Sequence, residues 1–115
     1  MSLADLEAKY PLIFTQGQPR GGPGWSALLE VLCARLQARA DESGLQPVAL
    51  QAREKWGYLS LRFHGLDPAD ASMVSYVEAL SKRVCEACGG PGQLIAENYH
   101  RTRCDEHRML APIQN

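Results

Sequence analysis

Two short stretches of this 115-residue chain together carry four potential metal ligands. The first is Cys85-Glu86-Ala87-Cys88-Gly89-Gly90. The second, Cys104-Asp105-Glu106-His107, begins after fifteen residues that follow Cys88. Each stretch carries two metal-ligating side chains separated by two residues, which places both on one tight turn. Two such turns that face each other supply the four-ligand tetrahedron that zinc prefers. The pattern therefore predicts a structural zinc site with one Zn²⁺ per chain. Its predicted ligands are Cys85, Cys88, Cys104 and His107.

These residues allow three other interpretations, each less consistent with the sequence than zinc ligation by His107. Cys85 and Cys88 have the spacing of a redox dithiol, but no predicted strand precedes them as the redox motif requires. Core cysteines without metal would not account for the doubled spacing. His100 is an alternative fourth ligand, and we favour His107 because it completes the second two-residue turn. Four protein ligands close the coordination shell, whereas catalytic zinc normally keeps one position for water.

The segment between the two cysteine pairs has the layout of a zinc ribbon. Residues 93–97 and 99–103 are expected to pair as a short hairpin that turns at Asn98. Few apolar side chains lie in this segment, so a bound metal would supply much of its folding free energy. Apparent zinc affinities in such modules reach about 10–16 kcal/mol.

Upstream of the cysteines, hydrophobic periodicity predicts two amphipathic helices and a hairpin. Apolar residues recur at helical spacing over 25–40, and Ser43-Gly44 ends that helix. Two alternating segments, Val48 to Arg53 and Tyr58 to His64, read as a hairpin that turns near Trp56 and has one buried face. Asp67-Pro68 starts the second helix, which runs into Cys85.

The first 24 residues are predicted to be a short helix and a linker. Ser2 is the expected N-cap of a helix that ends before Pro11. Residues 15–24 contain four glycines and two prolines and are expected to form a loop or linker. The expected fold class is α+β, with two amphipathic helices packed on a small antiparallel β-hairpin sheet and a C-terminal zinc ribbon. The predicted boundaries are 1–24, 25–84 and 85–109, with the ribbon and the core packed as one domain.

Composition narrows the range of functions. Twelve basic and thirteen acidic residues give a net charge of −1, which argues against a protein that mainly coats nucleic acid, although a local basic patch is compatible with it. No secretory signal or membrane-spanning run is recognisable, so we expect a cytoplasmic protein without a membrane partner. Neither a carboxylate pair nor a phosphate-binding glycine loop is visible, so no catalytic residue, enzyme activity or small-molecule substrate is predicted.

A few exposed aromatic and basic residues are candidates for partner binding. Aromatic side chains at an exposed turn often anchor a protein partner, and aromatic residues beside arginines can stack on nucleic-acid bases. The candidates are Trp56, Tyr58, Tyr99, Arg101 and Arg103.

Several of these stretches together resemble a known group of proteins. They are Gly24-Trp25 at a helix start, the hairpin stretch from Gln51 to Phe63, and the ending formed by residues 85–92 and 102–107. They are similar to small bacteriophage and prophage proteins that carry the pattern K-E-K-F/W-G-x-L-x-x-R-F before a zinc ribbon, a group with no agreed activity. The resemblance covers residues 24–108. It implies zinc ligation by the same four residues and a mobile-element setting in a bacterial host cell.

These observations lead to one functional expectation and two alternatives. We expect a non-enzymatic, zinc-stabilised binding protein of phage or mobile-element origin that binds and inhibits a host protein. An anti-CRISPR-type inhibitor of host defence is one such class. The alternatives are a nucleic-acid-binding zinc-ribbon regulator and an enzyme with an unrecognised site.

Overall fold

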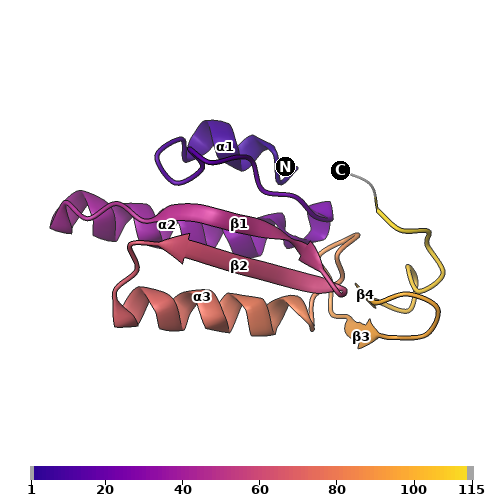
Figure 1. Cartoon of the computed structure of the whole chain (residues 1–115). Helices are drawn as coiled ribbons and strands as arrows, with labels where there is room; N and C mark the ends of the chain where they lie inside the picture. Colours follow the sequence, from indigo (N-terminus) through magenta and orange to yellow (C-terminus); the bar gives the residue numbers. More distant parts are fainter. Residues whose placement is uncertain (1, 114–115) are drawn as a thin grey trace.

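A computed structural model describes residues 2–113 of the chain (Figure 1). It has the predicted α+β architecture, in which helices pack on a small antiparallel hairpin and a second short hairpin lies near the C-terminus. No helix among the described residues is both long enough and apolar enough to cross a lipid bilayer. The elements in chain order are α1 (Asp5–Lys9), the 3-10 turn η1 (Pro23–Trp25), α2 (Ser26–Ser43), β1 (Val48–Lys55), β2 (Tyr58–His64), α3 (Pro68–Ser81), β3 (Gln93–Ile95) and β4 (Arg101–Arg103).

The first hairpin turns through two residues in the left-handed region. Lys55 pairs with Tyr58, and the two residues between them are Trp56, with φ 56°, and Gly57, with φ 87°. Positive φ at both positions is typical of a type I′ turn, whose twist suits an antiparallel hairpin. Glycine adopts this conformation freely, whereas it is unusual for a tryptophan.

A β-bulge corrects the predicted pattern of strand β1. The register passes from Ala49 opposite Phe63 to Gln51 opposite Arg62, so Leu50 is an extra residue. Leu50 is 51% exposed, while Ala49 and Ala52 are buried. The expectation that Leu50 and Ala52 share one face is therefore wrong, because an inserted residue reverses the alternation of side chains along a strand.

The two long helices begin and end where the sequence predicts, within a few residues. Gly44, with φ 78°, caps α2 and donates its N–H to the Ala40 carbonyl. The Asp67 carboxylate accepts the Asp70 N–H at 2.8 Å at the start of α3. α3 ends at Ser81, so a turn separates it from Cys85.

Side chains of α3 also cover the outer edge of β2. The N–H of Leu59 donates to Ser81 Oγ at 2.9 Å, and the N–H of Leu61 donates to Glu78 Oε2 at 2.8 Å. α2 lies behind the hairpin in Figure 1 and α3 runs beside β2. An edge that is covered in this way has fewer free N–H groups for pairing with another chain.

The N-terminal segment closes the other edge of the sheet, which the sequence did not indicate. The N–H of Arg20 donates to the Ala52 carbonyl at 2.9 Å, and the Arg20 carbonyl accepts the Glu54 N–H at 3.0 Å. The predicted linker is therefore an ordered part of the fold. The helix before it begins at Asp5, and Ser2 is not its N-cap: the Ser2 N–H instead donates to the Asp5 carboxylate at 2.9 Å.

A single apolar cluster joins the N-terminal segment, α2, the hairpin and α3. Trp25 is fully buried, and its indole N–H donates to the Val84 carbonyl at 2.9 Å, next to Cys85. The core thus extends directly to the first cysteine turn. The buried members of the cluster include Leu3, Leu6, Ile13, Phe14, Trp25, Leu29, Leu32, Leu36, Leu59, Leu61, Val74 and Val77.

Candidate metal centre

Backbone hydrogen bonds fix the first cysteine turn against strand β4. The N–H of Cys85 donates to the Gly90 carbonyl at 2.8 Å, and the N–H of Gly89 donates to the Cys85 carbonyl at 2.9 Å. The Glu86 N–H donates to the Thr102 carbonyl of β4 at 3.0 Å. Because β4 leads directly into Cys104, this pairing brings the two cysteine turns together.

The predicted hairpin supports the second turn. β3 and β4 are antiparallel, with Gln93 opposite Arg103 and Ile95 opposite Arg101. The connection passes through Asn98, whose φ of 66° allows the chain to reverse at the predicted position. Both strands are shorter than the expected segments, because the pairing covers three residues on each side.

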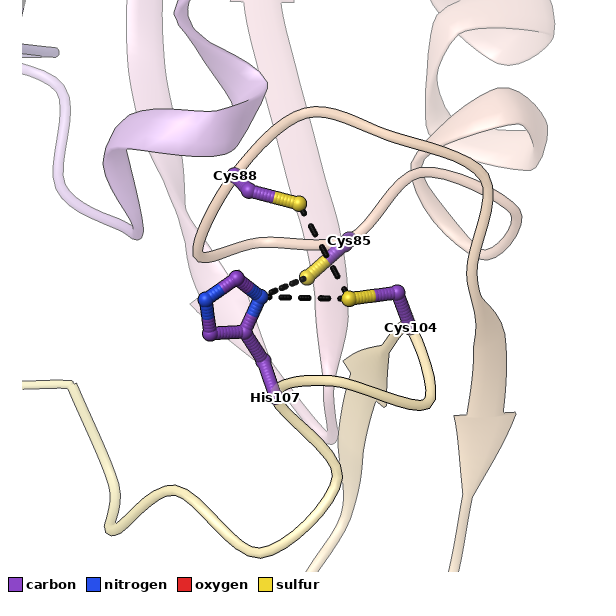
Figure 2. Close-up of side chains that lie close together, drawn as sticks. All are labelled: Cys85, Cys88, Cys104 and His107. Atoms are coloured by element: carbon purple, nitrogen blue, oxygen red, sulfur yellow. Dashed lines mark hydrogen bonds between the residues drawn. The ribbon is translucent and has the colours of Figure 1, made fainter.

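The four predicted ligand residues meet at one point (Figure 2). Their ligand atoms all lie within 4.8 Å of one another. His107 Nδ1 is 3.1 Å from Cys104 Sγ and 3.9 Å from Cys85 Sγ, and the sulfurs of Cys88 and Cys104 are 3.8 Å apart. All four cysteines of the chain are free, so this Cys₃His group can hold a metal ion.

The alternative ligand, His100, lies outside this group. Its ring packs edge-on against Trp56, with centroids 5.6 Å apart and an interplanar angle of 82°. The remaining cysteine, Cys33, is buried in the core on α2, where burial raises its pKa to about 12. Neither residue belongs to the metal-binding group.

The environment of the sulfurs favours a bound cation. Burial alone would raise the pKa of Cys85, but backbone N–H groups of Cys104, Cys88 and Ala87 lower that pKa to about 7. At Cys88 the Gly90 N–H, 3.4 Å from the sulfur, lowers the pKa, but desolvation and the neighbouring sulfurs outweigh it and raise the pKa overall. The Cys85 sulfur thus ionises readily while the Cys88 sulfur resists negative charge, and a central cation would relieve the repulsion between thiolates.

Two glycines of the N-terminal segment allow it to pack directly on the first cysteine turn. A Cβ on Gly24 would lie 2.1 Å from the Cys85 carbonyl oxygen and 2.5 Å from the Gly89 nitrogen. A Cβ on Gly22 would lie 2.1 Å from the Glu86 carbonyl oxygen, which accepts the Gly24 N–H at 2.8 Å. Sequence reasoning assigned these glycines to a loop, and only their position before the buried Trp25 pointed to a close approach.

Arg103 was expected on a partner-binding surface, but it is buried beside the metal-binding group. It is 1% exposed, and its guanidinium forms an ion pair with the buried Glu86 at 3.0 Å. It also donates to the carbonyls of His107 at 3.1 Å and Leu110 at 2.9 Å. The guanidinium therefore holds the chain around His107 through hydrogen bonds. Apolar packing could not do this, because the ribbon has few apolar side chains.

Arg101, another candidate for partner binding, is also buried. It is 4% exposed and donates to the carbonyls of Glu97 at 2.7 Å and Arg108 at 3.0 Å. Tyr99 is half-buried, and its hydroxyl donates to the Leu110 carbonyl. The centroid of its ring lies 4.6 Å from the Arg101 guanidinium carbon. These side chains join the ends of the ribbon loop through hydrogen bonds to main-chain carbonyls.

The other two candidate partner residues lie at the hairpin turn. Trp56 is 62% exposed, and Tyr58 is half-buried under the Lys82 ammonium, which lies 4.5 Å from the ring centroid. Of the five candidates, Arg101 and Arg103 are thus buried, Tyr58 and Tyr99 are half-buried, and Trp56 is exposed. Comparisons with protein-family models, with curated proteins and with solved structures found no match to this chain.

Proposed function

We propose that this protein is a non-enzymatic binding module whose C-terminal ribbon is held by a structural Zn²⁺. The observation that carries the proposal is the convergence of Cys85, Cys88, Cys104 and His107 from two turns. When bound there, the ion neutralises thiolate charge and crosslinks the two turns. The residues around the group would then present a fixed surface to a macromolecular partner.

The donor set and its dimensions support zinc. Zinc–sulfur bonds of about 2.3 Å in a tetrahedron place two sulfurs about 3.8 Å apart. The sulfurs of Cys88 and Cys104 are separated by 3.8 Å. Thiolate and imidazole ligands select zinc over the hard cations Mg²⁺ and Ca²⁺, which prefer oxygen.

The number of ligands supports a structural role. Four protein side chains complete the shell, so no coordination position is left for a water that the metal could activate. The buried Glu86–Arg103 pair and the contacts of Gly22 and Gly24 hold the group against the core. A site built in this way stabilises the ribbon, and loss of the metal would release it.

The wider setting rests on the resemblance to phage and prophage proteins. Inhibition of a host protein, an anti-CRISPR role and a bacterial cytoplasmic location stay predictions that follow from that resemblance.

Cobalt substitution tests the closed shell. The protein would be refolded with Co²⁺, and its visible spectrum recorded before and after addition of azide. We expect intense tetrahedral thiolate bands that azide leaves unchanged, because four side chains occupy every position. A spectrum that shifts with azide would show an open position and would contradict the structural role.

A further inference from the structure

Within the described range 2–113, one face of the β1–β2 hairpin is not covered by a helix, since α2 lies behind the hairpin and α3 beside β2 (Figure 1). Ala52 and Leu61 are paired and buried, so their face contacts the core. Residues that alternate with them point to the other side, since successive side chains on a strand alternate. A hydrogen bond of 2.7 Å between Gln51 Nε2 and Ser60 Oγ crosses this outer side. The cross-strand pairs on it are Gln51–Arg62, Arg53–Ser60 and Lys55–Tyr58.

Five cations gather on this outer side. Arg20 joins it through a parallel bridge with Arg53, and Lys82 reaches it from the end of α3 to lie over Tyr58. All five cationic residues are exposed, and none forms an ion pair with any residue in the described range 2–113. We call this surface the basic face; it consists of Arg20, Arg53, Lys55, Tyr58, Arg62 and Lys82.

The basic face as defined contains no acidic residue, and the half-buried Glu54 lines the neighbouring groove beside Arg20 and Arg53. Because the whole chain has a net charge of −1, acidic residues elsewhere in the sequence offset these five positive charges. Glu54, the acidic residue of the two strands, belongs to the inner register opposite Leu59 and accepts the Gly57 N–H at 2.8 Å. Neighbouring cations repel one another and do not stabilise the fold, but together they attract a polyanion.

The shape and polar groups beside the basic face fit an extended strand. A groove of about 470 Å³ runs between residues 16–20 and β1. Its polar and charged lining consists of Gln16, Gln18, Gln51, Arg20, Arg53 and Glu54. Amide side chains both donate and accept hydrogen bonds, as base edges require. Arg53 and Lys55 are two residues apart on β1, which separates their backbones by about 7 Å.

We propose that the basic face binds a single strand of nucleic acid, DNA or RNA. The exposed cations would contact successive phosphates, and arginine guanidinium groups match phosphate oxygens with two N–H donors. Tyr58 lies among these cations, half-buried with the Lys82 ammonium over its ring. A base that displaced this ammonium would stack on the ring, and stacking beside cations is the combination that single-strand binders use. The proposal rests on the proposed binding role and names its partner class. It places that partner on the hairpin and not on the buried Arg101 and Arg103 of the ribbon.

Fluorescence anisotropy on the zinc-loaded full chain tests this proposal with labelled oligonucleotides of fifteen thymidines or fifteen uridines. We expect binding at 50 mM NaCl that weakens about 50-fold at 200 mM, the salt dependence of about four phosphate contacts to a single strand. Arg53→Glu and Arg62→Glu should each weaken binding at least about tenfold. Arg35→Glu is the matched control, because Arg35 is exposed on α2 away from the basic face, and it should bind like the wild type.

Two further arms decide the class of partner. Tyr58→Leu should weaken oligonucleotide binding at least about fivefold through lost stacking. A labelled polyglutamate peptide and a DNA duplex of the same length should bind less tightly than the single strand. Tighter binding of polyglutamate would assign the basic face to an acidic protein, and tighter binding of the duplex would contradict the single-strand assignment.

Other outcomes would overturn the proposal without affecting the metal site. No oligonucleotide binding at 50 mM NaCl, or equal losses in Arg53→Glu and Arg35→Glu, would contradict a role for the basic face. Thermal melting of each variant followed by circular dichroism shows whether the fold is retained. The cobalt spectrum tests the metal separately, so a closed-shell spectrum with no oligonucleotide binding would remove only the nucleic-acid inference.

Discussion

At the residue scale, two histidines that are each followed by an arginine, His100 and His107, make different contacts. His107 presents Nδ1 to the sulfurs of Cys104 and Cys85, whereas His100 packs its ring against Trp56. Of these two histidines, His107 is therefore the one that can ligate a metal ion together with the three cysteines. The two-residue spacing in the sequence already favoured this assignment.

Replacing each histidine separately tests this distinction. His107→Ala should reduce the affinity for zinc at least about 100-fold, because it removes one of four ligands, while His100→Ala should bind zinc like the wild type. Competition with a chromogenic chelator measures both affinities. Retention of tight binding in His107→Ala and its loss in His100→Ala would reverse the assignment.

The buried ion pair between Glu86 and Arg103 is also a residue-scale feature with a measurable consequence. Replacing Arg103 with alanine leaves the Glu86 carboxylate buried without its partner, which should lower the free energy of unfolding by about 3–5 kcal/mol. Chemical denaturation of the zinc-loaded protein measures this loss. The double variant Glu86→Gln/Arg103→Met should recover part of it, because no unpaired charge remains. A single variant as stable as the wild type would contradict the importance of the pair.

At the element scale, the turn of the first hairpin contains a tryptophan in the left-handed backbone conformation, which tryptophan rarely adopts. Trp56 has a φ of 56° and is 62% exposed. Asparagine is common at this position of a type I′ turn, and left-handed backbone costs other residues roughly 1–2 kcal/mol.

We expect Trp56→Asn to raise the free energy of unfolding by about 1 kcal/mol, or Tm by about 4 °C, as strain at the turn is relieved. Lys55→Asn, one residue earlier on the extended strand, is the matched control and should give no increase. Differential scanning calorimetry compares the three proteins. A lower Tm for Trp56→Asn would show that the tryptophan stabilises the turn, for example through its contact with His100.

The same elements show what the sequence could and could not predict. Helix ends were predictable at Gly44 and at Asp67, where local backbone chemistry decides the conformation. The bulge at Leu50 was not, because the strand's alternation looked regular and the extra residue is accommodated only by pairing with β2. Propensity describes single segments, whereas a bulge belongs to a pair of strands.

At the scale of the whole molecule, the spacing of cysteines and histidine in the sequence predicted the metal-binding group. The surroundings of that group and the basic face depend on tertiary packing. Two turns with short ligand spacing are sufficient to identify four ligands. The burial of Arg103 and the packing of Gly24 against the first turn depend on segments that are distant in sequence. The basic face was missed because Arg20, Arg53 and Lys82 come together only when an N-terminal segment and a helix end flank the hairpin.

The central claim is that one structural Zn²⁺ holds this fold through four ligands. The most direct measurement is mass spectrometry of the purified, reduced protein under native and denaturing conditions, for the wild type and for Cys104→Ala. The claim predicts one zinc per native wild-type chain, its release on denaturation, and a large loss of zinc in the variant. Reduced wild-type protein that carries no metal, yet remains folded, would contradict it.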